Sequence, residues 1–355
     1  MSSQNAEEDW FVVEPRDPPN EGILFVDHAA AGRSGHLGHA LVEYAPGGIL
    51  AFFANCSAYH GGHSGDGWME YRRSEDGGRT WGEPSVLDYS RAVYEGHPDH
   101  SVMCEKAVLA DDGAIILFNL ECRGKKWQPL AVPTYLRSID GGLTWQPARV
   151  MGDHPGRIWD AMVHEGCIMA LELCNDSKVA WYGNLPEHHY ALYVSTDNGQ
   201  TFARRSVLPF EFEKRGYGTM AILPDGNLVV YVYNQADEKH LDYVTSVDGG
   251  HTWSDVQTSY MAKQIRNPQM AAFKQGYVLH GRSGNRGAET EKGHFVLYAS
   301  RDGLSWDAGR YLRIRQAGLG AYSNNVSISG PDRLLIQASH AYEEDKTSVF
   351  HWWLT

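Results

Sequence analysis

The phrase SEDGGRTW at residues 74–81 recurs four more times along the chain. The later copies read SIDGGLTW, STDNGQTF, SVDGGHTW and, one residue shorter, SRDGLSW, and they open at Ser138, Ser195, Ser246 and Ser300. Each copy follows an alternating apolar run, such as YALYVS or LDYVTS, which is typical of a strand with one buried face. The glycines supply the positive φ that a tight hairpin turn requires. The phrase therefore predicts five equivalent hairpin turns.

The spacing of the copies, roughly 50 to 65 residues, matches the length of one four-stranded propeller blade. Two more strands joined by a Gly-rich turn precede each copy, as in TMAILPDGNLVVYVYN. A sixth hairpin of this kind, AYSNNVSISGPDRLLIQASH, is followed only by the strand SVFHWWLT. The last blade is therefore one strand short. We expect FVVEP or GILFVDH, near the N-terminus, to complete it and close the ring.

These patterns predict an all-β fold, a six-bladed propeller that occupies residues 1–355 as a single domain. The expected blades cover roughly residues 36–90, 91–152, 153–212, 213–262, 263–315 and 316–355, the last with the N-terminal strand. Length alone would favour two domains, but all-β folds often exceed about 200 residues as one unit.

The formal net charge of −13 argues against nucleic acid or an anionic membrane as partner, because both attract basic surfaces. No apolar run approaches the ~18 residues that a membrane span needs. The stretch MSSQNAEEDWFVVEP lacks the basic and apolar regions of a signal peptide, and the five cysteines are scattered without a CxxC. We expect a cytoplasmic protein with reduced thiols and without a cofactor.

The repeated phrase resembles the Asp-box of the sialidase superfamily, also called the BNR repeat, and the resemblance covers nearly the whole chain. It implies a sialidase-type propeller in which these turns lie on the outer rim, away from the active site. That site would lie on the propeller axis, where each innermost strand begins. Sialidases use a Tyr nucleophile helped by a Glu, an Asp acid/base, and three Arg that bind the sialic carboxylate bidentately.

Only part of that catalytic set has a counterpart in this sequence. The stretch GAYSNNVSI makes Tyr322 the match for the nucleophile. The acid/base position falls on His63 in YHGGHSGDG, with Asp66 as the alternative. Where the helper Glu is expected, RGYGTM has Tyr217 and no acid. The first Arg of the triad is absent, and His39 lies beside its position. The resemblance therefore argues against an ordinary exo-sialidase and for a relative with changed chemistry.

Polar and aromatic residues open all six expected innermost strands, near His39, His100, Asp160, Tyr217, Arg266 and Tyr322. A purely structural propeller more often has small apolar groups there, so we expect a carbohydrate to bind on the axis. Arg266 and Arg282 are candidates for replacing part of the Arg triad. The expected substrate-binding residues are His100, Arg157, Trp159, Asp160, Tyr217, Arg266, Asn267, Arg282 and Asn324. Glu105 and Lys106 are expected instead to pair with each other.

Several candidates also have a structural interpretation. His39 is either a general acid or base, since imidazole titrates near neutral pH, or a histidine satisfied by a backbone carbonyl. Asp160 either accepts a sugar hydroxyl or forms a salt bridge with Arg157. Arg266 and Asn267 either neutralise a substrate carboxylate or form hydrogen bonds between blades.

Two HxxH pairs, His60 with His63 and His97 with His100, raise the question of a metal site. Neither pair falls in an expected helix, and the sequence offers no evident third ligand. We therefore expect no metal.

These residues suit three classes of function. We expect a carbohydrate-active enzyme, an exo-acting sialidase-like glycoside hydrolase that cleaves a glycosidic bond at or next to an acidic sugar of an oligosaccharide. Tyr322 would be the nucleophile and His63 or Asp66 the acid/base. The first alternative is a lyase that performs β-elimination at a uronic acid with His and Tyr as base and acid. The second alternative is a non-catalytic glycan-binding propeller.

Overall fold

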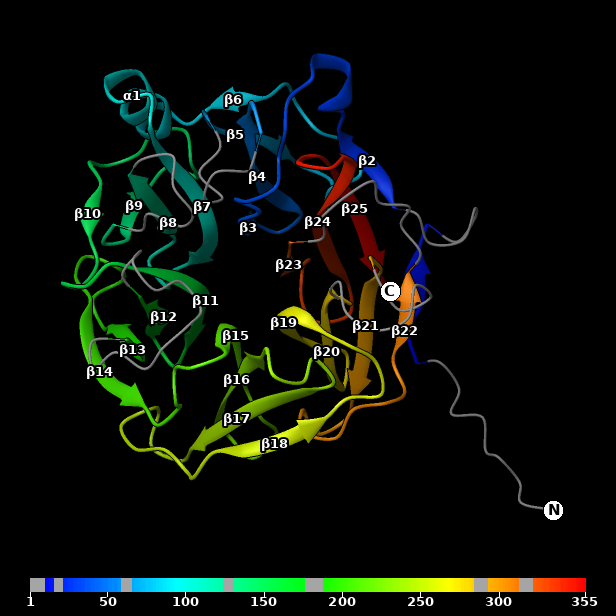
Figure 1. Ribbon diagram of the computed structural model, residues 1–355. Helices are drawn as coiled ribbons and strands as arrows, with labels where there is room; N and C mark the ends of the chain where they lie inside the picture. Colours follow the sequence, from blue (N-terminus) through cyan, green and yellow to red (C-terminus); the bar gives the residue numbers. More distant parts are fainter. Residues whose placement is uncertain are drawn as a thin grey trace.

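The computed structural model describes residues 10–15, 22–58, 66–123, 131–175, 188–283, 293–312 and 322–355. Within these ranges the chain forms six antiparallel sheets that stand around a central axis like the blades of a propeller (Figure 1). The first strand of each blade lies innermost, beside the axis, and successive strands lie farther out. This arrangement confirms the predicted six-bladed, all-β fold.

Each blade uses consecutive strands, which follow one another from the axis outward. Blade 1 contains β3 (Leu41–Ala45), β4 (Gly48–Cys56), β5 (Gly67–Ser74) and β6 (Ser85–Val86). Blade 2 contains β7 (His100–Leu109), β8 (Ile115–Arg123), β9 (Thr134–Ser138) and β10 (Arg149–Val150). Blade 3 contains β11 (Gly156–His164), β12 (Cys167–Cys174), β13 (His189–Ser195) and β14 (Ala203–Leu208).

The second half of the chain repeats the same order. Blade 4 contains β15 (Arg215–Ile222), β16 (Leu228–Asn234), β17 (His240–Ser246) and β18 (Gln257–Tyr260). Blade 5 contains β19 (Arg266–Phe273), β20 (Gly276–Arg282), β21 (Phe295–Ser300) and β22 (Arg310–Leu312). Blade 6 contains β23 (Ser323–Ser327), β24 (Leu334–Glu343) and β25 (Lys346–Leu354).

Two N-terminal strands close the ring. Both β1 (Val13–Glu14) and β2 (Ile23–Val26) pair antiparallel with β25, along different parts of its length. Two hydrogen bonds between the backbones of Val12 and Thr355 extend the first of these pairings. The innermost strand β23 contacts β3, so the first and last blades are neighbours. Both segments that the sequence offered as alternatives thus contribute to the sixth blade.

Among the described residues, two short helices interrupt the strand pattern. The 3-10 helix η1 (Ala29–Ala31) follows β2, and the helix α1 (Asp88–Gly96) joins β6 to β7. In α1 the hydroxyl of Ser90 accepts a hydrogen bond from the Met69 amide and donates one to the Val102 carbonyl, which fixes the helix against blades 1 and 2. Neither helix was expected from the sequence. Neither has the length and apolar run that a membrane-spanning helix needs, and this holds for the described residues only.

The apolar core lies mainly between neighbouring blades, because the two faces of each sheet meet the sheets on either side. Ile116 and Phe118 of β8, for example, share one buried cluster with Ile168 and Ala170 of β12. The five cysteines are free thiols, four of them buried. The blades are therefore held together by packing rather than by disulfides in this structure.

The repeated phrase forms the turn between the third and the outermost strand of each of the first five blades. In the first copy the Ser74 hydroxyl donates to Asp76 Oδ1 (2.8 Å) and accepts from the Gly78 amide (2.9 Å). The Thr80 amide and hydroxyl donate to Oδ1 and Oδ2 of Asp76, at 2.9 and 2.6 Å. These bonds to the ionised carboxylate hold the pKa of Asp76 at about 2. Equivalent side-chain bonds recur at Asp140, Asp197, Asp248 and Asp302.

The same turns also fit each blade against the preceding one. The Trp145 ring lies 6.0 Å from Phe52 of blade 1, and the Trp306 ring lies 6.2 Å from Tyr231 of blade 4. The second Gly of the phrase leaves no room for a side chain, since a Cβ on Gly142 would lie 2.4 Å from Leu50. The phrase therefore stabilises the turns and the blade spacing.

Candidate functional site

Five of the six innermost strands contain a β-bulge; the one in β3 lies at Tyr44, beside the hairpin turn, and each of the other four displaces a polar or aromatic residue from the regular pairing. The residues concerned are Glu105 in β7, Trp159 in β11, Tyr217 in β15 and Asn267 in β19. A bulge redirects a side chain and is common beside active sites. Tyr217 and Asn267 also have φ values of 55° and 52°, which non-Gly residues rarely adopt. The strands are therefore irregular where the sequence predicts a site.

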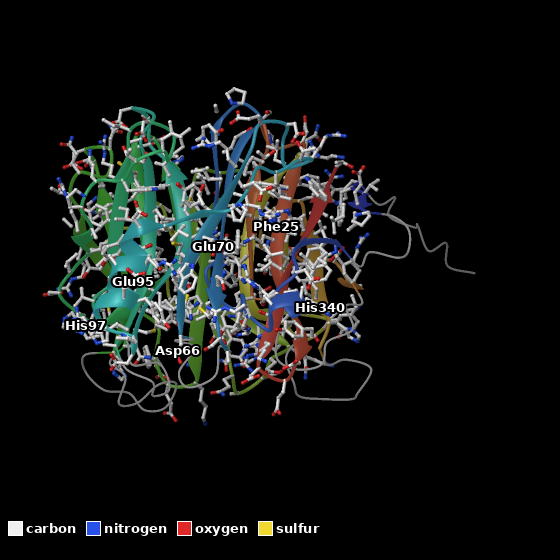
Figure 2. All side chains as sticks on the ribbon, turned by 90° about the horizontal axis from the view of Figure 1, so that it is seen from above. Phe25, Asp66, Glu70, Glu95, His97 and His340 are labelled. Carbon is white, nitrogen blue, oxygen red and sulfur yellow. The ribbon has the colours of Figure 1, made fainter. Side chains whose placement is uncertain are left out.

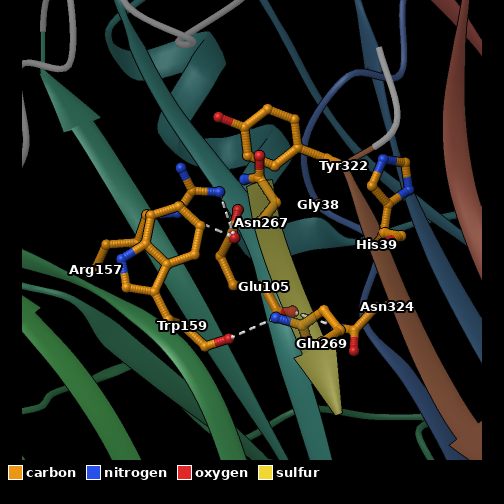
Figure 3. Close-up of a pocket in the computed structure, with 10 residues that line it drawn as sticks. Gly38, His39, Glu105, Arg157, Trp159, Asn267, Gln269, Tyr322 and Asn324 are labelled. Carbon is orange, nitrogen blue, oxygen red and sulfur yellow. Dashed lines mark hydrogen bonds and ion pairs between the residues drawn. The ribbon is translucent and has the colours of Figure 1, made fainter. Parts of the chain in front are cut away.

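A small cavity lies on the propeller axis among these residues (Figure 3). Its volume is about 20 Å³, enough for one water molecule. The described residues that line it are Gly38, His39, Glu105, Arg157, Trp159, Asn267, Gln269, Tyr322, Ser323 and Asn324. They come from or directly precede the innermost strands of five different blades. The cavity is thus built from residues far apart in the sequence.

Four buried polar atoms of the lining residues have no hydrogen-bond partner among the residues that the structure describes. They are the acceptors Glu105 Oε1 and Gln269 Oε1 and the donors Asn267 Nδ2 and Trp159 Nε1. Unpaired buried polar atoms are costly in a folded protein, and in a native site they point to a ligand or a bound water. A mixture of donors and acceptors suits hydroxyl groups, which can both donate and accept.

Two tyrosines from different blades meet beside the cavity. The hydroxyl oxygens of Tyr217 and Tyr322 lie 3.3 Å apart, and both side chains are buried. Arg266 Nη2 and Arg282 Nη2 each donate to the Tyr217 hydroxyl, both at 3.3 Å. Asn267 Oδ1 accepts from Arg282 Nε at 2.8 Å and so holds this guanidinium in place. The phenol pair therefore sits in a strongly positive environment.

That environment lowers the pKa of one phenol and raises the pKa of the other. Burial alone would raise the pKa of Tyr217, but the charges of Arg266 and Arg282 outweigh it and lower the pKa to about 7. The pKa of Tyr322 is raised, first by burial and then by the negative charge that Tyr217 carries when ionised. Because the groups are coupled, the pair loses a first proton near neutral pH and holds the second.

Arg157 is a third arginine close to the tyrosine pair, and it lines the cavity. Arg157 donates to Glu105 Oε2 from both Nε (3.1 Å) and Nη2 (2.6 Å). Its guanidinium carbon lies 3.8 Å from the centre of the Trp159 ring and 5.5 Å from that of Tyr322. The guanidinium of Arg282 lies 5.0 Å from the same Tyr322 ring. Such contacts between a cation and an aromatic face are attractive.

Several charged groups on this part of the axis lie close together. Glu105 pairs with Arg157, and Glu238 lies 3.9 Å from Arg266. Arg282 brings a further positive charge to the tyrosine pair. Burial raises the pKa of Glu105, although the charge of Arg157 opposes this shift. Guanidinium groups in a buried site bind anionic ligands well.

Comparison with known proteins identifies the family. Residues 49–333 match the sequence model of the BNR repeat-like domain. The chain belongs to this family. No curated relative matches the sequence.

Solved structures that resemble this BNR repeat-like propeller share its fold at low sequence identity. A protein of unknown function from Dyadobacter fermentans superimposes with a TM-score of 0.71 at 15% identity, over 94% of this chain and 97% of the other. A variant of the NanB sialidase from Streptococcus pneumoniae gives 0.67 at 13% identity, over 94% and 70%. The Penicillium chrysogenum α-L-arabinanase, solved with arabinobiose, gives 0.56 at 14% identity, over 90% and 97%. These structures support a sialidase-type propeller and a fold used by glycosidases.

His39 of the BNR propeller lines the cavity, but both of its ring nitrogens have partners. Nε2 lies 3.0 Å from the His36 carbonyl, and Nδ1 lies 3.2 Å from Gln337 Nε2. Burial lowers the pKa of His39 to about 4, so the ring is neutral near pH 7. This geometry favours the structural interpretation, a histidine satisfied by a backbone carbonyl.

The ion pairs of Asp160 and Glu105 in the BNR propeller differ from those predicted. Asp160 does not bond Arg157; it binds Lys106 Nζ at 2.9 Å and accepts from the Thr219 hydroxyl at 2.8 Å. Glu105 and Lys106 do not pair with each other, because Glu105 binds Arg157 and Lys106 binds Asp160. Asp160 is thus buried in a structural network.

Asn324 is also held by protein groups, since its Oδ1 accepts from Lys106 Nζ (2.6 Å) and its Nδ2 donates to the Glu105 carbonyl (2.7 Å). The amide therefore links the innermost strands of blades 6 and 2. Although it lines the cavity, both ends of this side chain are already bonded. Its position favours a role in closing the ring over direct contact with a substrate.

The remaining candidates do not line the cavity or lie outside the described residues. Figure 2 shows Asp66 and His97 at the same end of the molecule, where β5 and β7 begin. Neither Asp66 nor His100 is among the described residues that line the cavity. His60 and His63 lie outside the described residues. Within the described ranges, no group of three or more His, Cys, Asp or Glu is arranged to hold a metal ion.

Glu105 is the lining residue that sequence analysis assigned to the wrong partner. From the sequence it was expected to pair with Lys106, the residue next to it. The bulge at Glu105 shifts the pairing by one residue and turns this carboxylate toward Arg157. A charged pair within the otherwise apolar run VMCEKAVL was the signal available in the sequence.

Proposed function

We propose that this protein is a retaining glycoside hydrolase that cleaves the glycosidic bond of an acidic sugar, with Tyr322 as the nucleophile. The observation that carries the proposal is the contact between Tyr322 and Tyr217 beside Arg266 and Arg282. A phenol is a weak nucleophile until a neighbouring base removes its proton. Tyr217, with a pKa of about 7, is suited to be that base.

Proton transfer within the pair would proceed along the 3.3 Å contact between the two hydroxyls. As Tyr322 attacks the anomeric carbon, its proton moves to the ionised oxygen of Tyr217. The guanidinium groups that lower the pKa of Tyr217 would stabilise the negative charge before the attack. In this scheme Tyr217 performs the task that the sialidase resemblance gives to a Glu.

The arginines support an acidic sugar as substrate. Arg157, Arg266 and Arg282 approach the tyrosine pair from blades 3 and 5, and planar guanidinium groups bind carboxylates well. Trp159 offers an aromatic face, although Arg157 covers one side of it. The cavity of about 20 Å³ is smaller than a sugar ring, so the proposal requires its lining side chains to separate when substrate enters.

The β-elimination alternative is less well supported by the arrangement of side chains. It requires a histidine that is free to accept or donate a proton near Tyr322. Among the described residues, His39 lines the cavity, but its two ring nitrogens already contact His36 and Gln337. The ring of His36 lies 4.6 Å from that of Tyr322 but does not line the cavity. We therefore favour hydrolysis, and the products of the reaction distinguish the two.

The test uses a panel of oligosaccharides that end in sialic acid or a uronic acid. Hydrolysis releases a reducing sugar without new ultraviolet absorbance, whereas elimination creates an unsaturated uronate that absorbs. We expect the first result, and we expect Tyr322→Phe to abolish it while Tyr190→Phe, a buried tyrosine of β13, retains activity. Full activity of Tyr322→Phe, or binding of the glycans without turnover by the wild-type protein, would refute the proposal.

A further inference from the structure

Retaining hydrolysis needs a second group that donates a proton to the leaving oxygen and later removes one from water. Neither sequence-derived candidate supplies it among the described lining residues, since Asp66 does not line the cavity and His63 lies outside the described ranges. Glu105 is the one carboxylic acid among the described residues that line the cavity. We propose that Glu105 performs both proton transfers; this inference rests on the hydrolase function proposed above.

The two oxygens of the Glu105 carboxylate have different surroundings. Oε2 accepts from Nε and Nη2 of Arg157, at 3.1 and 2.6 Å, which fixes the orientation of the group. Oε1 is buried and has no hydrogen-bond partner among the described residues. Figure 3 shows the carboxylate beside Arg157, in the same cavity as Tyr322. One oxygen is therefore anchored and the other remains available to a proton on a substrate or a water.

The position of Glu105 in the fold supports this role. The bulge in β7 removes the residue from the regular ladder, and the side chain is only 9% exposed. Lys106, the next residue, binds Asp160 and Asn324, so among the described residues Glu105 pairs with Arg157 alone. Burial raises the pKa of Glu105 against the opposing charge of Arg157, which favours a carboxyl that can hold a proton.

The reaction balances with the groups that the site provides. In the first step the Tyr322 oxygen bonds to the anomeric carbon, and the bond from that carbon to the leaving oxygen breaks. The Glu105 proton moves to the leaving oxygen, and the Tyr322 proton moves to Tyr217. In the second step water attacks the same carbon, Glu105 takes its proton, and the bond to Tyr322 breaks. Tyr322 then recovers its proton from Tyr217.

The test compares Glu105→Gln with the wild-type enzyme on two glycosides of the same acidic sugar. One carries an alkyl alcohol, which needs a proton to leave, and the other carries 4-methylumbelliferone, which does not. We expect kcat/KM to fall at least a hundredfold for the alkyl glycoside and less than about tenfold for the aryl one. Azide should restore turnover of the aryl glycoside, because it attacks the glycosyl-enzyme without needing a base, and it should yield the glycosyl azide.

The controls separate proton transfer from a purely structural role. Glu172→Gln changes another buried carboxyl, in β12 and away from the cavity, and should affect both glycosides alike. Glu105→Asp keeps a charge for Arg157 and covers the case in which Glu105→Gln does not fold. We expect it to lose activity on the alkyl glycoside selectively and to show no rescue by azide on that substrate.

Three outcomes would overturn the inference. The first is an equal loss on both glycosides without azide rescue, in whichever of the Glu105 variants folds. The second is retention of full activity on the alkyl glycoside. The third is that Asp66→Asn, and not a Glu105 variant, loses activity selectively on the alkyl glycoside. If the wild-type protein cleaves neither glycoside of any acidic sugar, the hydrolase proposal itself fails, and that result is distinct from the other three.

Discussion

The hydroxyl oxygens of Tyr217 and Tyr322 lie 3.3 Å apart, although the two residues belong to blades 4 and 6. The Tyr217 hydroxyl accepts hydrogen bonds from Arg266 and Arg282. The guanidinium groups of Arg157 and Arg282 lie over the ring of Tyr322. Because the two hydroxyls are in contact, ionisation of one phenol changes the pKa of the other, and the two titrations are coupled. Several properties of the protein should depend on this pair.

The first prediction concerns the ionisation of Tyr217. Its pKa of about 7 means that one tyrosine should ionise near neutral pH, far below the usual pKa of about 10. Ultraviolet absorbance of tyrosinate, followed between pH 5 and 9, should reveal this single titration in the wild-type protein. It should disappear in Tyr217→Phe and remain in Tyr190→Phe, because burial raises the pKa of Tyr190. A titration that survives in Tyr217→Phe would contradict the assignment.

The second prediction concerns Arg266. Replacing it by Gln removes a hydrogen bond to Tyr217 and one of the two charges that lower the pKa of this phenol. The tyrosinate titration should therefore move to higher pH. Loss of a charged hydrogen bond of about 1.5–3 kcal/mol corresponds to a decrease in kcat/KM of about tenfold to a hundredfold. Arg204→Gln, an exposed arginine of β14, should change neither value.

The sequence was most informative about features that repeat. The recurring Ser-x-Asp phrase, the alternating runs and their spacing predicted six blades and their hairpin turns, because the bonds that hold each turn, such as those of Asp76, involve residues within one phrase. The contact of Tyr322 with Tyr217 spans 105 residues and depends on bulges that shift the strand register. Bulges leave little trace in an apolar pattern, so the expected pairing of Glu105 with Lys106 was wrong, as was the alternative that paired Asp160 with Arg157.

The third prediction tests the second glycine of the repeated phrase. Gly250 has a φ of 88°, and a Cβ there would lie 2.3 Å from Leu192 of the preceding blade. Gly226, in the same blade, has a φ of 86° but nothing within 4 Å of its Cβ position. Both Ala variants should therefore carry the same backbone strain of roughly 1–2 kcal/mol. Only Gly250→Ala should lose a further ~1–3 kcal/mol from overpacking, measured by denaturant unfolding.

Equal loss of unfolding free energy in the two Ala variants would contradict this explanation. It would mean that the cost comes from the positive φ alone and that the neighbouring blade yields to the added methyl group. The same pair of measurements thus separates the turn geometry from the packing between blades.

The fourth prediction concerns stability in mild acid. The pKa of His39 is about 4 in the folded protein because the ring is buried, against about 6.5 when unfolded. As the pH falls from 6.5 toward 4, the unfolded state binds a proton that the folded state does not. The free energy of unfolding should therefore decrease over this window and be unaffected by His39 above it.

For one histidine with this shift the loss is about 3 kcal/mol. Denaturant unfolding between pH 7.5 and 4 should show a shallower decrease in His39→Gln than in the wild-type protein. His154→Gln, at a more exposed position, serves as the control. A pH dependence that is the same in all three proteins would exclude a neutral, buried His39.

The most direct test of the account is to trap the nucleophile. A fluorinated glycosyl fluoride of the acidic sugar that the enzyme cleaves slows the second step more than the first, so a glycosyl-enzyme should accumulate. Digestion and mass spectrometry should then find one added sugar on Tyr322, and Tyr217→Phe should form the adduct more slowly. A sugar attached to any other residue, or turnover by the wild-type enzyme without an adduct, would contradict the proposed role of the tyrosine pair.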